Sequence, residues 1–171
     1  MNVRLAEVVT MAKDVVVGES ADEITDALLA ASRLLVALSA RSIALVDESI
    51  TIPQFRTLVI LSTRGPSKVV TLSNALNVQP STAARMVDRL VAAGLVNRKP
   101  NPDSRRELII ELTTLGHRVV DQVTDHRRRE IAAVVERMPE RDRSGLVRAL
   151  TAFTAAGGEP HRDLDVDSYQ L

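Results

Sequence analysis

The sequence predicts a mainly α-helical protein that carries one small β-hairpin. Apolar residues recur at three- and four-residue spacing through most of the chain, which is the period of amphipathic helices. Two short helical segments joined by a turn occupy about 71–93, and a proline-containing turn between two alternating segments follows at about 95–112. Helix, turn, helix and hairpin in this order predict a winged helix-turn-helix.

Composition limits the chemistry that the chain can perform. Its 171 residues, 45% of them apolar, can form a buried core, and the 2% of aromatic residues offer little for stacking single-stranded bases. Without cysteine, and with His117, His126 and His161 scattered, we expect no metal site and no cofactor. No catalytic constellation or phosphate-binding glycine loop is present, which predicts that the protein is not an enzyme. Short apolar runs and the absence of a signal-peptide pattern predict a cytoplasmic protein without a membrane partner.

The N-terminal part predicts a long helix with two apolar stripes. Residues 1–19 lack a clear period and form an N-terminal extension with the capacity to become helical, whereas Ser20 and Glu23 match a capping box that opens a helix to about Val46. The first stripe contains Ile24, Ala27, Leu28, Ala31, Leu34, Leu35, Leu38 and Leu45, and the second contains Leu29, Val36 and Ile43. One stripe would pack within a monomer. The second therefore predicts a homodimer that buries residues 20–50.

The winged helix-turn-helix region is expected at 51–112 and begins with a support helix. Thr51 and Gln54 match a second capping box, and Gly65-Pro66 ends the helix that it opens.

Two short helices come next. Thr71 is expected to cap the first, which ends near Asn77. Pro80 suits the first turn of the second, expected at about 80–93, because its missing N–H would have no helical partner there. Gly94 closes this helix.

The wing is expected as a strand at 95–99, a turn at 100–104 and a return strand at 106–112. Leu108, Ile110 and Leu112 alternate with glutamates in the return strand, so we expect these three side chains to face the core. Ile109 is then an apolar residue on the solvent face.

The C-terminal part predicts two more helices and a tail. Thr113 caps a long helix that runs to Met138 and ends at Pro139, and a last helix covers 140–156. The acidic, non-periodic tail at 158–171 is expected to be disordered.

Positive charge gathers in the predicted helix-turn-helix and wing. The whole chain has 22 basic and 22 acidic residues, yet the segment from Arg64 to Arg106 has eight basic and two acidic ones, a local net charge of +6. A basic face on an otherwise acidic molecule attracts a polyanion, and duplex DNA selects proteins largely through its phosphates. The basic run at 127–129 is read as a solvated helix face.

Position selects the residues that would touch DNA. The second helix of a helix-turn-helix enters the major groove, where arginine reads guanine while serine and threonine anchor phosphate. Arginines at a hairpin tip suit the narrow minor groove of A·T tracts. The candidate DNA-binding residues are Gln79, Pro80, Ser81, Thr82, Arg85 and Arg89 from the helix, and Arg98, Lys99, Arg105 and Arg106 from the wing.

Residues 20–157 resemble the MarR family of bacterial transcriptional regulators. The shared order is a long helix, the Thr-x-x-Gln helix, the segment LSNALNVQPSTAARMVDRLVAAGLV, an SRR wing, LTxxG at 112–116 and two terminal helices. The resemblance implies a homodimer whose helices at 20–50 and 113–157 interlock, a recognition helix in the major groove and a wing arginine in the minor groove. It also implies a small aromatic or phenolic effector bound between the two regions, for which we assign no residues.

The wing tip departs from the family pattern Asp-x-Arg. Aligned from Leu112, the pattern falls on residues 104–106, so Ser104 replaces the aspartate and Arg106 is the minor-groove residue. Aligned from Asp103, the pattern favours Arg105 instead.

These observations predict a homodimeric, sequence-specific double-stranded DNA-binding regulator that represses transcription at a pseudo-palindromic operator until a small molecule releases it. A ligand-independent architectural DNA-binding protein and a winged-helix protein-interaction module are the alternatives. Equal affinity for a palindrome and for random DNA would favour the architectural protein.

Overall fold

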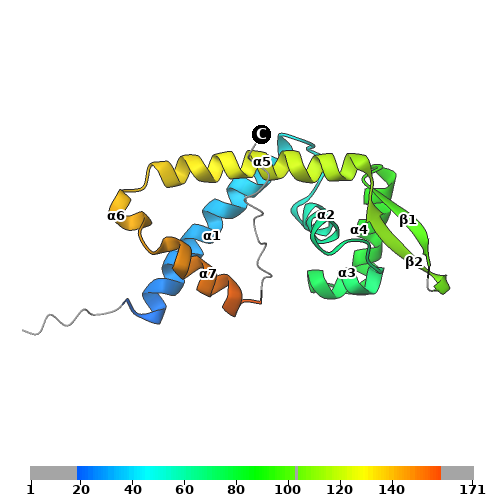
Figure 1. The fold of residues 1–171 in the computed structure, drawn as a ribbon, viewed down its shortest axis with the longest axis horizontal. Coiled ribbons are helices and arrows are strands. Elements are labelled where there is room, and N and C mark those ends of the chain that lie inside the picture. Colours follow the sequence, from blue (N-terminus) through cyan, green and yellow to red (C-terminus); the bar gives the residue numbers. More distant parts are fainter. Residues whose placement is uncertain (1–18, 103, 159–171) are drawn as a thin grey trace, which may run out of the picture. The chain divides into compact units, whose positions relative to one another are not determined.

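The computed structural model describes residues 19–102 and 104–158, without the side chains of Arg105 and Arg106. The predicted N-terminal extension, except Glu19, and the predicted tail, except Gly158, lie outside the described residues. The elements in chain order are α1 (Ala21–Ala44), α2 (Ile52–Arg64), α3 (Val69–Leu76), α4 (Pro80–Ala92), β1 (Val96–Asn101), β2 (Ser104–Leu112), α5 (Thr114–Glu136), α6 (Glu140–Arg143) and α7 (Leu146–Ala156) (Figure 1). This order confirms the mainly helical class with one small hairpin.

The chain divides into two units, Met1–Val36 and Ala37–Leu171. In the first, the predicted capping box begins α1: the Ser20 amide donates to a carboxylate oxygen of Glu23 at 2.8 Å, and the Glu23 amide donates to the Ser20 hydroxyl at 3.2 Å. These bonds from Ser20 hold the pKa of Glu23 below its ordinary value.

Burial along α1 differs from the prediction. One stripe was expected inside the monomer, but both are exposed over most of their length. Ile24, Leu34, Leu35 and Leu45 of the first stripe and Leu29 and Val36 of the second are exposed, whereas Leu38 and Ile43, one from each stripe, are each 2% exposed. Only the last two turns of α1, around Leu38 and Ile43, are buried. Position along the helix, and not helix face, therefore decides which of these side chains a single subunit covers.

The core of the second unit surrounds α2. Leu58 and Leu61 of this helix are almost fully buried, in one cluster with residues from α3, α4, β2 and α5. The predicted capping box is present, because the Thr51 amide donates to Gln54 Oε1 at 2.8 Å and the Gln54 amide donates to Thr51 Oγ1 at 3.4 Å. Gly65 ends α2 with a φ of 77°, which favours glycine.

Helix α3 begins earlier than predicted. Its N-cap is Lys68 instead of Thr71, and the Leu72 amide donates to the Lys68 carbonyl at 3.0 Å. The cause is a β-bridge between Ser67 and Ile110, whose reciprocal backbone bonds of 2.9 and 2.8 Å hold the chain extended up to Lys68. The predicted end is confirmed by Asn77, which adopts the left-handed conformation with a φ of 53°.

The hairpin has a tighter tip than predicted. Pro100, Asn101 and Ser104 belong to the strands, with Pro100 opposite Leu108 and Asn101 opposite Ser104, so the expected turn at 100–104 is wrong. Among the described residues β1 is paired on one side only, and an edge strand tolerates proline.

The expected inward face of β2 is present only near the body. Ile110 is fully buried and Leu112 is half-buried, but Leu108 is 51% exposed. The alternating pattern predicted that all three side chains face the core. The prediction is wrong for Leu108, because the hairpin tip extends beyond the helices that cover Ile110 (Figure 1).

The C-terminal helices also differ from the prediction in one respect. Thr113 caps α5 as expected, accepting a hydrogen bond from the Gly116 amide at 3.0 Å. The single helix expected at 140–156 is two helices, α6 and α7. The break lies at Ser144, which is extended, and at Gly145, whose φ of 80° is incompatible with a continuous right-handed helix.

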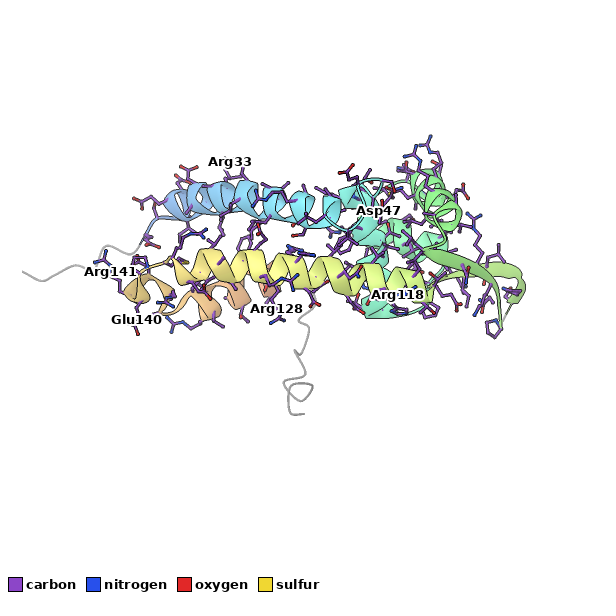
Figure 2. The ribbon with its side chains drawn as sticks, turned by 90° about the horizontal axis from the view of Figure 1, so that it is seen from above. Arg33, Asp47, Arg118, Arg128, Glu140 and Arg141 are labelled. Carbon is purple, nitrogen blue, oxygen red and sulfur yellow. The ribbon has the colours of Figure 1, made fainter. Side chains whose placement is uncertain are left out.

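The short apolar runs of the sequence predicted no helix able to span a bilayer. Within the described ranges, however, α1 has the length and apolar content of such a helix, with a mean hydropathy of 1.5. One such helix is weak support for a span, because an apolar face that another protein covers gives the same signal. Arg33 lies near the middle of α1 and projects from its surface, where a bilayer would have to accommodate a cation (Figure 2). This cation argues against a membrane span of α1.

Gly116 provides a test of the packing between α5 and the wing. A Cβ atom at this position would lie 2.1 Å from the Leu95 carbonyl oxygen and 3.1 Å from Leu112 Cδ2, so Gly116→Ala must push backbone apart. We expect it to lower the free energy of unfolding by about 3 kcal/mol, the upper end of the usual cost of overpacking. Denaturant titration measures this.

Gly157→Ala is the matched control. Its nearest neighbours would be 3.5 and 3.6 Å away and its φ is −80°, so it should leave stability nearly unchanged. Equal stability of the two variants would contradict the close approach at Gly116.

Candidate nucleic-acid interface

Helix α4 presents one polar face to solvent because its other face is anchored. Ala83, Val87 and Leu90 are almost fully buried in the core and fix the rotation of the helix. Pro80 occupies the first turn as predicted, and the following turn of α4 carries Arg85 on the exposed side. The candidate residues Gln79, Pro80, Ser81, Arg85 and Arg89 are exposed, and Thr82 is half-buried.

The turn between α3 and α4 is short and well bonded. Asn77 in its left-handed conformation donates its amide to the Asn74 carbonyl at 3.1 Å, and the Val78 amide donates to the Ser73 carbonyl at 3.0 Å. Gln79 is the N-cap of α4, and its carbonyl accepts from the Thr82 amide at 2.9 Å. The two helices therefore form the compact helix-turn-helix that the sequence predicted.

The arginines of α4 have no acidic partner among the described residues. Arg85 Nη2 lies 3.5 Å from the Thr82 hydroxyl, a weak contact within the same helix. Arg89 makes no ion pair with any described carboxylate. Both guanidinium groups thus keep their full charge toward solvent, in the place where a recognition helix would face DNA.

The cations of the wing are arranged differently, because carboxylates already neutralise two of them. Arg98 of β1 forms an ion pair with Asp88 of α4, and Lys99 Nζ lies 2.5 Å from Glu111 Oε1 of β2. The first pair connects the wing to the recognition helix, and the second connects the two strands. Both cations are among the candidate residues predicted from the sequence, but their acidic partners are not.

A third pair connects β2 to the start of α3. Lys68 Nζ lies 2.6 Å from Glu107 Oε2, which also accepts a bond of 3.2 Å from Asn101 Nδ2. The hydrogen bond from Lys68 is the main reason why the pKa of Glu107 is below its ordinary value, while partial burial acts in the opposite direction. Lys68 therefore belongs to this surface, although it was not among the candidate residues.

The strand register explains why these partners were missed. Lys99 lies opposite Ile109, so Glu107 and Glu111 are its diagonal neighbours on the same face of the hairpin. The expected five-residue turn gave a different register and hid this relation. The observed register follows from a shift in the pairing between Pro100 and Asn101, an irregularity that no local sequence pattern indicated.

Arg105 and Arg106 belong to β2 next to the hairpin tip, but their side chains lie outside the described part of the chain. Which of them enters a minor groove stays a prediction. The run Arg127, Arg128 and Arg129 is exposed on α5, as expected for a solvated helix face. Figure 2 shows Arg128 on this helix.

One open hollow lies apart from the wing, between the last turn of α1 and the middle of α5. Its volume is about 370 Å³, and it is lined by Leu45, Val46, Gln122, Asp125, His126 and Arg129. Four of these side chains offer hydrogen bonds or charges, and none is a Phe, Tyr or Trp. Within the described ranges no three His, Cys, Asp or Glu side chains are grouped to hold a metal ion.

The Lys68–Glu107 pair makes the interface sensitive to acid. Because the pKa of Glu107 is lowered in the folded protein, the pair stabilises the fold above the ordinary glutamate pKa of 4.5, and this contribution is lost as the pH falls through the lowered value. Lys68→Met should raise the pKa of Glu107 toward 4.5. Carboxyl NMR titration measures the change.

Glu23 is the internal control, because Ser20 and not Lys68 lowers its pKa. Its titration should not move in the Lys68→Met variant. A Glu107 pKa that also stays in place would show that the pair is not formed in solution.

Comparison with known proteins places this geometry in a family. A model of the MarR family matches residues 50–108, which cover α2 to the middle of β2. The crystal structure of RV1404 from Mycobacterium tuberculosis is similar with a TM-score of 0.78 and 67% identity, covering 84% of this chain and 98% of that one.

Two curated proteins are also similar. The HTH-type transcriptional repressor NicR of Pseudomonas putida is 40% identical over 75 residues, 44% of this chain, and the match spans about half (48%) of NicR. The multiple antibiotic resistance protein MarR of Escherichia coli is 29% identical over 109 residues, 61% of this chain and 76% of MarR. These relatives are named as regulators or resistance proteins and not as enzymes, in agreement with the absence of a catalytic constellation in the sequence. The helix-turn-helix, the hairpin and the likeness to these proteins together show that the chain belongs to the MarR family of transcriptional regulators.

Proposed function

We propose that the protein is a homodimeric, sequence-specific double-stranded DNA-binding repressor of transcription. The observation that carries this proposal is the exposed face of α4, where Arg85 and Arg89 keep uncompensated charge on a helix whose opposite face is locked in the core. Arginine in this position can bond guanine in the major groove. The similarity to NicR, a transcriptional repressor, supports repression of transcription over its activation.

The homodimer is supported by apolar surface that one subunit leaves uncovered. Leu29 and Val36 on α1 are 53% and 57% exposed, and Val147 and Phe153 on α7 are 79% and 54% exposed. Each of these two helices thus exposes large apolar side chains to water, as interaction sites do, and a second copy of the same chain can cover matching surfaces through two-fold symmetry. Two recognition helices related in this way require a pseudo-palindromic operator, with half-sites roughly 10 bp apart or a multiple of that.

Release by a small molecule completes the proposed function. An effector weakens DNA binding only when it binds better to a dimer whose recognition helices are wrongly spaced. The family resemblance suggests an aromatic or phenolic compound. A repressor must be in the same compartment as the DNA that it binds, so the proposed function implies a cytoplasmic protein.

The DNA-binding proposal is tested with fragments selected from genomic DNA by the purified protein. A recovered site should be a pseudo-palindrome, and the protein should bind it far more tightly than a random duplex of equal length. Equal affinity for both would favour an architectural DNA-binding protein. Failure to bind either would favour a protein-interaction module.

Arg85→Ala tests the role of α4 in reading bases. On the recovered operator we expect a loss of about 1–3 kcal/mol and a relaxed preference at one position of each half-site. Arg143→Ala removes an exposed arginine from the end of α6 and is the control. An equal loss on every sequence would instead make Arg85 a phosphate contact.

Leu29→Glu tests the dimer surface. A charge placed in a buried apolar contact should shift the protein from dimer toward monomer, which analytical ultracentrifugation measures against the subunit mass of 18.6 kDa. The matched control is Leu115→Glu, at an exposed position in the first turn of α5, where an acidic residue is well tolerated. Dissociation of neither variant would exclude this surface from the interface.

A further inference from the structure

Three carboxylates lie among the cations of the candidate interface. Asp88 pairs with Arg98, Glu111 pairs with Lys99 at 2.5 Å, and Glu107 pairs with Lys68 at 2.6 Å. Each pair connects two different elements of the winged helix. The cations that remain without an acidic partner in the described interface include the two arginines of α4.

The paired carboxylates reduce what their cations can offer to DNA. A carboxylate within 3 Å of an ammonium group places negative charge beside any phosphate that this ammonium would contact. The phosphate must then either displace the carboxylate or accept its repulsion, which amounts to about 1 kcal/mol for two charges at 4 Å in water. Affinity gained from phosphate contacts does not depend on sequence.

Exposure shows that these pairs are accessible to DNA and not parts of the core. The side chains of Lys68 and Glu107 are 48% and 45% exposed, and that of Lys99 is 57% exposed, while its partner Glu111 is half-buried at 23%. Exposed pairs of this kind contribute little to stability. Their carboxylates can therefore be neutralised without unfolding the hairpin.

We propose that Asp88, Glu107 and Glu111 are counter-charges that limit the affinity of the interface for DNA of any sequence. This proposal rests on the proposed DNA-binding function and adds a regulatory property to the same site. The cations of the wing and of the start of α3 are restrained by Glu107 and Glu111 of β2 and by Asp88 of α4. Arg85 and Arg89 of α4 have no such partner among the described residues, so that contacts from the helix that reads bases contribute a larger share of binding.

The test uses the full-length protein and a random-sequence 30-bp duplex, with affinity measured by fluorescence anisotropy over a series of salt concentrations. The variant Glu107→Gln/Glu111→Gln keeps side-chain shape and removes both charges. We expect binding to the random duplex to tighten by about tenfold or more at low salt, and log K to fall more steeply with log[salt] by about 1.8 per subunit. Asp88→Asn should act in the same direction.

The matched control is Glu130→Gln. Glu130 forms an exposed ion pair with Arg41 at 3.1 Å, outside the winged helix, and its loss should leave both DNA affinity and salt dependence unchanged. Thermal unfolding of all variants confirms that they remain folded.

Two outcomes overturn the proposal. Unchanged affinity of the double variant would show that these carboxylates do not restrain the cations, and weakened affinity would show that they position the cations for binding. Failure of the proposed function is a separate result, since it appears in the unmodified protein as equal affinity for the recovered operator and the random duplex.

Discussion

The recognition helix, the wing and α5 are joined at one short junction, and the geometry of the interface depends on it. Thr113 donates its hydroxyl to the Gly94 carbonyl at 2.8 Å and its amide to the Leu95 carbonyl at 3.0 Å, while its hydroxyl also accepts from the amide of Gly116. One residue therefore caps α5 and ties it to the chain that leaves α4. The absence of a side chain at Gly116 allows α5 to lie against this chain. These few contacts connect α4, the hairpin and α5 at one place.

Local signals predicted the helices well, because capping chemistry acts over three or four residues. The boxes at Ser20 and Thr51, the cap at Thr113 and the turn at Asn77 are all present where the sequence indicated them. The start of α3 was wrong because its cause is a bridge from Ser67 to Ile110, more than forty residues away in the chain. Long-range contacts of this kind leave no trace in a local pattern.

The candidate interface was predicted in its location but not in its electrostatics. Counting residues gave a concentrated positive charge, and the structure confirms that the cations of α4 are exposed. The count omitted Glu107 and Glu111, which follow the counted segment, and it could not show that Asp88 faces Arg98 across two elements. Pairing depends on strand register, and the register of this hairpin depends on a shift between Pro100 and Asn101 that a regular alternating pattern does not predict.

The exposed apolar length of α1 has a consequence for the life of the newly made chain. If a second copy covers this surface, as proposed, the assembled state is favoured by mass action, and the melting temperature must rise with protein concentration. A subunit that has not yet met its partner presents Leu29 and Val36 to water. Proteases would then preferentially degrade subunits that have no partner. The fraction of such subunits is highest at low protein concentration, so the degradation rate per subunit would fall as the number of copies in the cell rises.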